Sequence, residues 1–232
     1  MAVRLILVHS PLVGSATWEL VAADLSSTGF DPAVVDLTGT IPAGPPYSGK
    51  QAEVIACGAA DQPAVLVGHS GAGPLLPAAG MIIGRVRGYV FVDAGLPTPG
   101  RSWMETAPPD LAGQLRGMAD DRGWLPPWPQ WWSEEVMAEL LPDQAVRQRF
   151  VADCQRLPLA MFEEAQAPAP QWPDAPVAYL QLSEAYQDQA ATARERGWRV
   201  REQISHHLGM LTEPARVAAS LRDLLDQLTR TI

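Results

Sequence analysis

The feature that most constrains the fold is an apolar run that ends abruptly in glycines around a serine. The run begins at Pro63 and ends at Pro74, and small residues follow it as far as Met81. Its letters are Pro63-Ala64-Val65-Leu66-Val67-Gly68-His69-Ser70-Gly71-Ala72-Gly73-Pro74. The β-branched part predicts a buried strand, and the small residues predict a helix packed closely beneath a sheet. The stretch therefore predicts a strand, a sharp turn and a helix, with Ser70 at the apex.

A serine at such a turn is a candidate nucleophile. Because its hydroxyl is weakly nucleophilic at neutral pH, it needs an exposed position, a base and hydrogen-bond donors for the developing oxyanion. An elbow between glycines supplies the first and the third. The sequence around Ser70 departs from the G-x-S-x-G motif, since Ala72 takes the last position and Gly73 comes one residue later. A plain tight turn is the alternative, but the strand before Ser70 and the helix after it favour the nucleophile.

The rest of the chain alternates between strand and helix patterns. Strands are expected at residues 3–8, 33–35, 88–92, 177–182 and 198–204, besides the central one. Helices are expected at residues 15–26, 51–60, 74–83, 187–197 and 213–228. This rhythm predicts an α/β fold with a doubly wound, mostly parallel sheet of about six strands, whose sites lie at the carboxyl ends of the strands. We expect one domain over residues 1–232.

The alternation of strand and helix patterns stops between residues 96 and 176, where we expect a helical lid inserted into the domain. This segment holds six of the eight tryptophans, among several prolines: Trp103, Trp124, Trp128, Trp131, Trp132 and Trp172. Aromatic side chains commonly line pockets for bulky apolar ligands, so Trp128, Trp131 and Trp132 are candidate substrate contacts. The alternative is that the tryptophans only pack a small helical excursion against the sheet.

The composition and charge of the chain limit the classes of function that it can have. A net charge of −9 and a pI near 4.9 argue against binding nucleic acid, because the phosphates would be repelled. No stretch approaches the roughly 20 apolar residues of a membrane span. Two cysteines, Cys57 and Cys154, are too few for a disulfide scaffold and favour a reducing cytoplasm. We expect an enzyme for a small-molecule substrate that uses no metal and no cofactor.

The histidines carry a resemblance to a known superfamily. Residues 205–214, Ser205-His206-His207-Leu208-Gly209-Met210-Leu211-Thr212-Glu213-Pro214, resemble the histidine loop of the α/β-hydrolases. In pattern the whole chain is most similar to small methylesterase and hydroxynitrile-lyase members, which also begin with a strand that ends in a His-Ser/Thr loop. That loop here is His9-Ser10-Pro11-Leu12-Val13-Gly14. The resemblance implies the α/β-hydrolase fold, a Ser-His-acid triad and acyl chemistry, with His207 as the base in preference to His206.

The acid of the implied triad has two candidates. The superfamily usually places it just after the strand before the last, where Glu184 stands. A minority of members place it after the preceding strand, where Asp93 stands. Either carboxylate could orient the imidazole, and Glu184 is preferred because it lies nearer the usual place.

The oxyanion hole departs from the resembling enzymes. One donor should be the backbone N–H of Gly71, and the other should come from the loop after the first strand, where His9 is a further candidate oxyanion or substrate contact. The residue expected to give the second donor is Pro11, which has no N–H. Leu12 could take over, or the Ser10 hydroxyl could help, or the hole could be partial.

These observations favour a serine hydrolase that acts on an ester, thioester or lactone of a bulky apolar or aromatic acyl compound through an acyl-enzyme on Ser70. A role for this enzyme in tailoring natural products is suggested only by its resemblance to small α/β-hydrolases. The main alternative is a lyase, isomerase or cyclase that uses the same pocket with His207 as acid and base, and Pro11 supports it. A non-catalytic ligand receptor is the third possibility.

Overall fold

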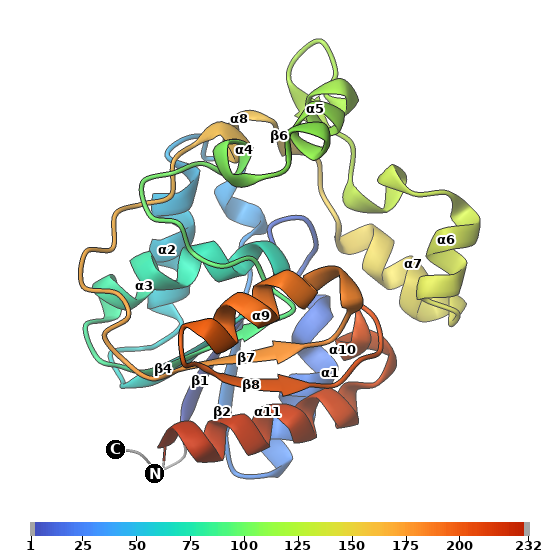
Figure 1. Ribbon diagram of the computed structural model, residues 1–232. Coiled ribbons are helices and arrows are strands. Elements are labelled where there is room, and N and C mark those ends of the chain that lie inside the picture. The colour runs from blue at the N-terminus through green and yellow to red at the C-terminus, as the bar shows by residue number, and fades with distance from the viewer. Residues whose placement is uncertain (1–2, 230–232) are drawn as a thin grey trace.

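Six parallel strands form the centre of the molecule, in the computed structural model that describes residues 3–229 (Figure 1). Their spatial order is β2-β1-β3-β4-β7-β8, and each neighbouring pair is parallel. The strands are β1 (Arg4–Val8), β2 (Asp31–Val35), β3 (Ala64–His69), β4 (Val86–Val92), β7 (Val177–Gln181) and β8 (Arg199–Glu202). The predicted doubly wound α/β architecture is confirmed.

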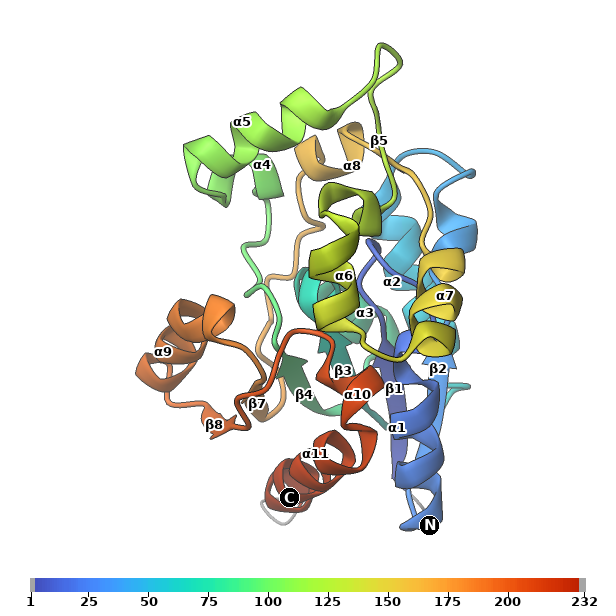
Figure 2. The same cartoon turned by 90° about the vertical axis from the view of Figure 1, so that its right-hand side faces the viewer.

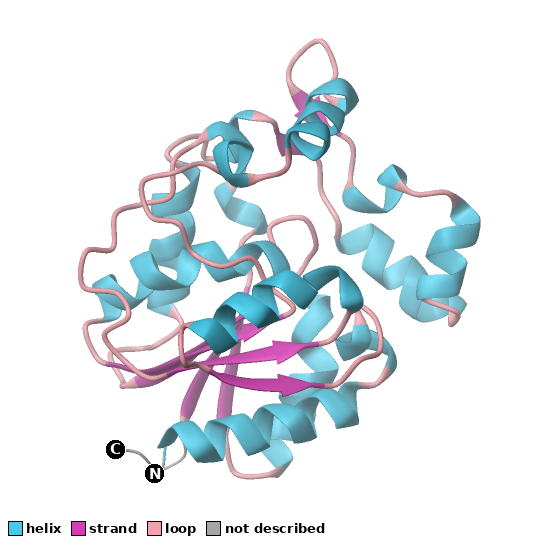
Figure 3. Cartoon of the chain, viewed as in Figure 1, coloured by secondary structure: helices cyan, strands magenta, loops and turns pink. Residues whose placement is uncertain are grey.

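Helices cover both faces of the sheet (Figure 3), which explains why the central strands are continuous apolar runs. Leu5 and Leu7 of β1 belong to the core beneath α1 (Ala16–Ser27) and α11 (Pro214–Thr229). Ile6 and Val8 belong to the opposite core, beneath α2 (Tyr47–Cys57), α3 (Leu76–Ile83) and α9 (Gln187–Glu195). This alternation follows from the period of two along a strand.

The turn after β3 explains why the sequence around Ser70 departs from the usual G-x-S-x-G motif. Ser70 opens the 3-10 helix η2 (Ser70–Leu75) at φ 55°, a left-handed conformation that is uncommon for a residue other than glycine. A Cβ at Gly73 would lie 2.2 Å from the carbonyl oxygen of Gly95, so this position requires glycine. Ala72 is fully buried in the core. The close backbone approach therefore falls at Gly73, and Ala72 is compatible with the elbow.

Most of the segment between β4 and β7 forms a separate layer at the carboxyl ends of the strands, toward which the strand arrows point in Figure 2. We call residues 103–163 of this layer the cap. Its elements are α4 (Trp103–Thr106), α5 (Pro109–Met118), β5 (Trp124–Leu125), η3 (Trp128–Trp131), α6 (Glu134–Leu140), α7 (Gln144–Asp153), β6 (Leu157–Pro158) and α8 (Ala160–Glu163).

The cap packs onto the loops that carry the candidate site. Met137 of α6 and Phe150 of α7 share an apolar cluster with Val13, in the loop after β1, and with Leu208, next to the histidine pair. Trp172 does not belong to this layer, because its ring packs edge-on against Tyr89 and Phe91 of β4. The expectation that Trp172 belongs to the lid is therefore wrong.

None of the helices within residues 3–229 has the length and apolar character needed to cross a membrane.

Candidate active site

Three side chains from distant parts of the sequence form one hydrogen-bonded chain at the carboxyl ends of the strands. The Nε2 atom of His207 lies 3.0 Å from Ser70 Oγ, and its Nδ1 atom lies 2.8 Å from Asp93 Oδ2. A carboxylate can only accept, so Nδ1 carries the hydrogen and Nε2 is free to accept the Ser70 proton. The order serine, imidazole, carboxylate is the one that activates a serine nucleophile.

The carboxylate beside His207 is Asp93, so the preference for Glu184 is wrong. Asp93 follows β4 and is fully buried, whereas Glu184 is exposed and opens the 3-10 helix η4 (Glu184–Tyr186) after β7. The two strands are neighbours, with Val92 opposite Leu180, so both loops begin at the same edge of the sheet. The loop after β7 directs two of its backbone N–H groups toward the Asp93 carboxylate, and Asp93 in turn is the carboxylate that contacts the imidazole.

Asp93 is held in place by that neighbouring loop. Its Oδ1 atom accepts the backbone N–H groups of Leu182 at 2.8 Å and Ser183 at 3.0 Å. Its Oδ2 atom accepts the Ser183 hydroxyl at 2.6 Å in addition to His207. A buried charge is costly unless it is paired and hydrogen-bonded, and these donors meet that requirement.

The histidine loop has the expected register, because His207 faces Ser70 whereas His206 contacts Thr212 Oγ1 at 2.6 Å. His69, next to the serine, holds this loop by donating from Nε2 to the carbonyl oxygen of His207 at 3.0 Å. Burial, and then the nearby charge of His207, keep the pKa of His69 well below its usual value. His69 therefore acts as a neutral donor that fixes the backbone of His207.

His9, a candidate oxyanion or substrate contact, has a structural position instead. Its Nδ1 atom donates to the carbonyl oxygen of Ser10 at 2.8 Å, and its Nε2 atom accepts the backbone N–H of Leu37 at 3.0 Å. Burial lowers its pKa, so the neutral ring matches these two partners. With both nitrogens engaged, His9 anchors the loop after β1, and the expectation that it contacts substrate is wrong.

The loop after β1 brings a hydroxyl to the position where Pro11 lacks an N–H. Ser10 Oγ accepts the backbone N–H of Leu12 at 3.3 Å, and a Cβ on Gly71 would lie only 2.9 Å from that oxygen. The Ser10 hydroxyl thus lies beside Gly71, and Leu12 is its backbone donor. Of the three alternatives for the second oxyanion donor, this geometry favours Ser10, supported by Leu12.

Sequence reasoning missed Tyr186, which contacts two members of the site. Its phenolic oxygen lies 3.3 Å from Ser70 Oγ, and its ring stacks on the His207 imidazole with centroids 4.9 Å apart and planes 5° apart. Burial raises the pKa of Tyr186 to about 12. The only sequence signal was its position in the loop after β7, where the acid was expected.

The three candidate tryptophans lie in the cap. Trp128 packs edge-on against Phe150 and Trp132, and the indole N–H of Trp131 donates to the carbonyl oxygen of Pro126 at 2.9 Å. Trp132, which is 50% exposed, borders a cap cavity of about 700 Å³ together with Met137 and Val151 of α6 and α7. These partners show that the indoles pack the cap; whether they also touch substrate stays a prediction.

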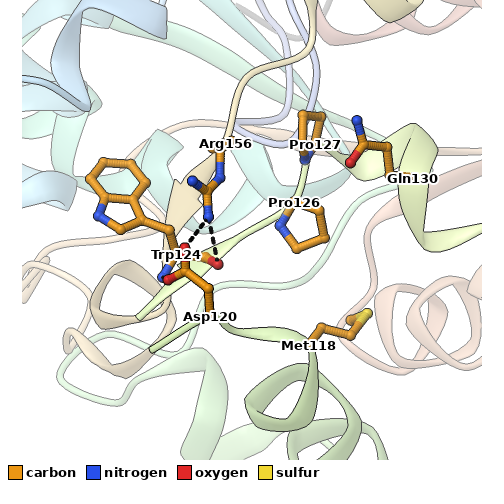
Figure 4. Close-up of a pocket in the computed structure, with 7 residues that line it drawn as sticks. All are labelled: Met118, Asp120, Trp124, Pro126, Pro127, Gln130 and Arg156. Atoms are coloured by element: carbon orange, nitrogen blue, oxygen red, sulfur yellow. Dashed lines mark hydrogen bonds and ion pairs between the residues drawn. The ribbon is translucent and has the colours of Figure 1, made fainter. Parts of the chain in front are cut away.

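A second cap cavity, of about 420 Å³, lies beside β5 (Figure 4). Arg156 pairs there with Asp120 at 2.5 Å and donates to the carbonyl oxygen of Trp124 at 3.2 Å. Within residues 3–229, no group of three or more His, Cys, Asp or Glu side chains is arranged to hold a metal ion.

The sequence matches the profile of the Alpha/beta hydrolase family over residues 5–220. The chain belongs to this family. The match confirms the predicted superfamily and supports an enzyme of the hydrolase class. No curated protein sequence that was compared with this hydrolase matches it significantly.

Solved structures with the same fold cover almost the whole hydrolase. An extracellular α/β-hydrolase from a Paenibacillus species, reported to share homology with tobacco salicylic acid binding protein 2, has a TM-score of 0.78 at 16% identity, covering 96% of this chain and 98% of that one. A pyrethroid hydrolase from Sphingobium faniae has a TM-score of 0.76 at 21% identity, covering 97% and 98%. Tomato methylketone synthase I has a TM-score of 0.75 at 14% identity, covering 98% and 99%. At these identities the likeness establishes the fold.

Proposed function

We propose that this hydrolase cleaves an ester, thioester or lactone through an acyl-enzyme on Ser70. The observation that carries the proposal is the position of the His207 imidazole, 3.0 Å from Ser70 Oγ on one side and 2.8 Å from the buried Asp93 carboxylate on the other. A serine with a base in reach, and a carboxylate that fixes the base, is the arrangement needed for nucleophilic acyl transfer.

In acylation, Ser70 Oγ attacks the carbonyl carbon and its proton passes to His207 Nε2. Asp93 stabilises the imidazolium that forms and keeps its hydrogen on Nδ1. His207 then protonates the leaving alcohol or thiol. A water molecule repeats these steps on the acyl-enzyme, which releases the acid and restores Ser70.

The oxyanion is stabilised by the backbone N–H of Gly71 and by the Ser10 hydroxyl. Ser10 uses an oxygen lone pair to accept from Leu12, so its own hydrogen can point toward the substrate oxygen. Donation from Leu12 polarises the hydroxyl and strengthens it as a donor. This arrangement supplies a second donor in a loop where Pro11 has none.

The cap supports a preference for bulky apolar or aromatic acyl groups. Trp128 and Leu12 pack against one apolar cluster that links the cap to the loop after β1. One of the structural relatives is a pyrethroid hydrolase, and another is likened to a salicylic acid binding protein. Such a preference would suit a role in tailoring natural products.

Turnover of p-nitrophenyl esters of increasing acyl size tests both parts of the proposal. Ser70→Ala should abolish turnover of every ester while leaving the unfolding temperature nearly unchanged. Trp128→Ala should raise KM for long or aromatic acyl groups more than for acetate. Trp198→Ala is the control for lost packing, because the Trp198 ring packs against Phe91 and Trp172. Full turnover by Ser70→Ala would contradict the acyl-enzyme, and a parallel loss on all esters in Trp128→Ala would contradict the substrate preference.

A second candidate function is acid-base chemistry by His207 without an acyl-enzyme, as in a lyase, isomerase or cyclase. Pro11 favours it, because a weak oxyanion hole matters less when no tetrahedral intermediate forms. Under this alternative the Ser70→Ala variant would keep its activity on the physiological substrate.

A further inference from the structure

Tyr186 lies against both reacting side chains, although no step above uses it. It comes from η4, so it reaches the site from the loop after β7. Its phenolic oxygen is 3.3 Å from Ser70 Oγ, and its ring lies parallel to the His207 imidazole. The Ser70 hydroxyl has one hydrogen, which points to His207 Nε2, so the phenol must be the donor in its contact with Ser70.

We infer that Tyr186 is a further catalytic residue of this hydrolase, which donates a hydrogen bond to Ser70 Oγ and thereby speeds breakdown of the acyl-enzyme. The inference rests on the proposed function, because it needs an acyl group on Ser70. It adds a group that the triad and the oxyanion donors do not include.

The effect falls on breakdown because the charge on Ser70 Oγ changes through the cycle. In the acyl-enzyme, Oγ is an ester oxygen and a poor acceptor. When the tetrahedral intermediate collapses, the C–Oγ bond breaks with its electron pair on Oγ, and the His207 imidazolium returns the proton taken from water. A hydrogen bond to an oxygen that gains charge becomes shorter and stronger. The 3.3 Å contact of the free enzyme would tighten at this step.

Tyr186 keeps its proton throughout. Burial raises its pKa to about 12, opposed by the hydrogen bond to Ser70 and reinforced by the charge of Asp93. The phenol is therefore a donor at neutral pH and adds no ionisable step to the reaction.

One short loop supports the site from two directions. Leu182 and Ser183 hold the Asp93 carboxylate, and Tyr186, three residues after Ser183, covers the imidazole that this carboxylate orients. The ring stack limits rotation of His207, so it helps to keep Nε2 directed at Ser70. The loop that usually carries the acid in this superfamily therefore serves here to hold an acid from the neighbouring strand.

The test compares Tyr186→Phe, which keeps the ring and removes the hydroxyl, with Tyr89→Phe. The control makes the same change at a buried phenol that bonds Asp174 at 2.7 Å, away from Ser70. For p-nitrophenyl acetate, kcat/KM reports acylation, and kcat reports acyl-enzyme breakdown because the leaving group is good. The fraction of enzyme that carries the acetyl group during turnover is measured by intact mass after an acid quench.

In Tyr186→Phe we expect kcat to fall about tenfold, the effect of losing one hydrogen bond to a charged oxygen, while kcat/KM changes less than about twofold. The acylated fraction should rise, and Tyr89→Phe should change neither its acylated fraction nor the ratio of kcat to kcat/KM. Equal values in wild type and Tyr186→Phe, or a parallel fall of kcat and kcat/KM, would overturn this role alone. A wild-type enzyme that turns over no ester and takes no acyl group would overturn the proposed function as well.

Discussion

Replacing Asp93 by asparagine keeps the shape of a buried side chain but removes its charge and one acceptor oxygen. The surroundings determine how the new amide is oriented. Two backbone N–H groups, from Leu182 and Ser183, point at Oδ1 and cannot turn away, so the amide oxygen must occupy that place. The opposite orientation would leave those N–H groups unpaired at about 1–3 kcal/mol each.

The amide NH₂ then faces His207 Nδ1, where Asp93 Oδ2 stands at 2.8 Å. Because NH₂ donates, the imidazole must accept at Nδ1 and carry its hydrogen on Nε2, which points at Ser70. Such a tautomer cannot take the Ser70 proton. The same exchange in a serine protease costs about 10,000-fold in kcat, which corresponds to roughly 5.4 kcal/mol of transition-state stabilisation.

The assay is steady-state turnover of a p-nitrophenyl ester by Asp93→Asn and by Glu184→Gln. We expect a loss of about 10,000-fold in kcat for Asp93→Asn. Glu184 is exposed, so its variant should stay within about twofold of wild type, which follows the small effects of surface substitutions. Unfolding temperatures check that both variants are folded. A larger loss in Glu184→Gln would refute the assignment of the acid.

Three further predictions concern neighbouring groups. His207→Ala should abolish ester turnover whereas His206→Ala, which loses its contacts with Thr212 and the Leu208 N–H and none with Ser70, should retain most of it; equal losses would contradict the register of the loop. Ser10→Ala should lower kcat by about 100-fold, as expected for an oxyanion donor, and an unchanged kcat would exclude this role. Burial holds the pKa of Tyr89, Tyr179 and Tyr186 above the ordinary value, so the stability that they contribute is present below about pH 10 and is lost as the pH rises further. Urea unfolding at a series of alkaline pH values should show this loss, and a shallower one in Tyr186→Phe; a flat profile would contradict it.

The sheet and the elbow could be predicted because they depend on local pattern. Strands buried on both faces read as apolar runs, and the turn at Ser70 needs small residues wherever backbones approach closely. Ends of elements were less predictable. The second strand begins at Asp31 and includes Pro32, which an edge strand tolerates because one side of it forms no ladder.

The acid could not be selected from the sequence, because Asp93 and Glu184 follow neighbouring strands whose ends meet at one edge. What separates them is the direction of each side chain after its strand ends, and Asp93 takes a φ of 44° there. Sequence spacing carries no information on that direction. For the same reason the sequence did not predict the contact of Tyr186 with the site, because this contact depends on how η4 turns back over His207.

The arrangement of Ser70, His207 and Asp93 predicts one activated serine, and a fluorophosphonate probe tests this most directly. Such a probe reacts with a serine only when a base removes its proton. After labelling and digestion, mass spectrometry should find the phosphonate on Ser70, with no adduct in Ser70→Ala and much slower labelling in His207→Ala. Labelling at another residue, or an unlabelled Ser70 in an enzyme that still hydrolyses esters, would contradict the account.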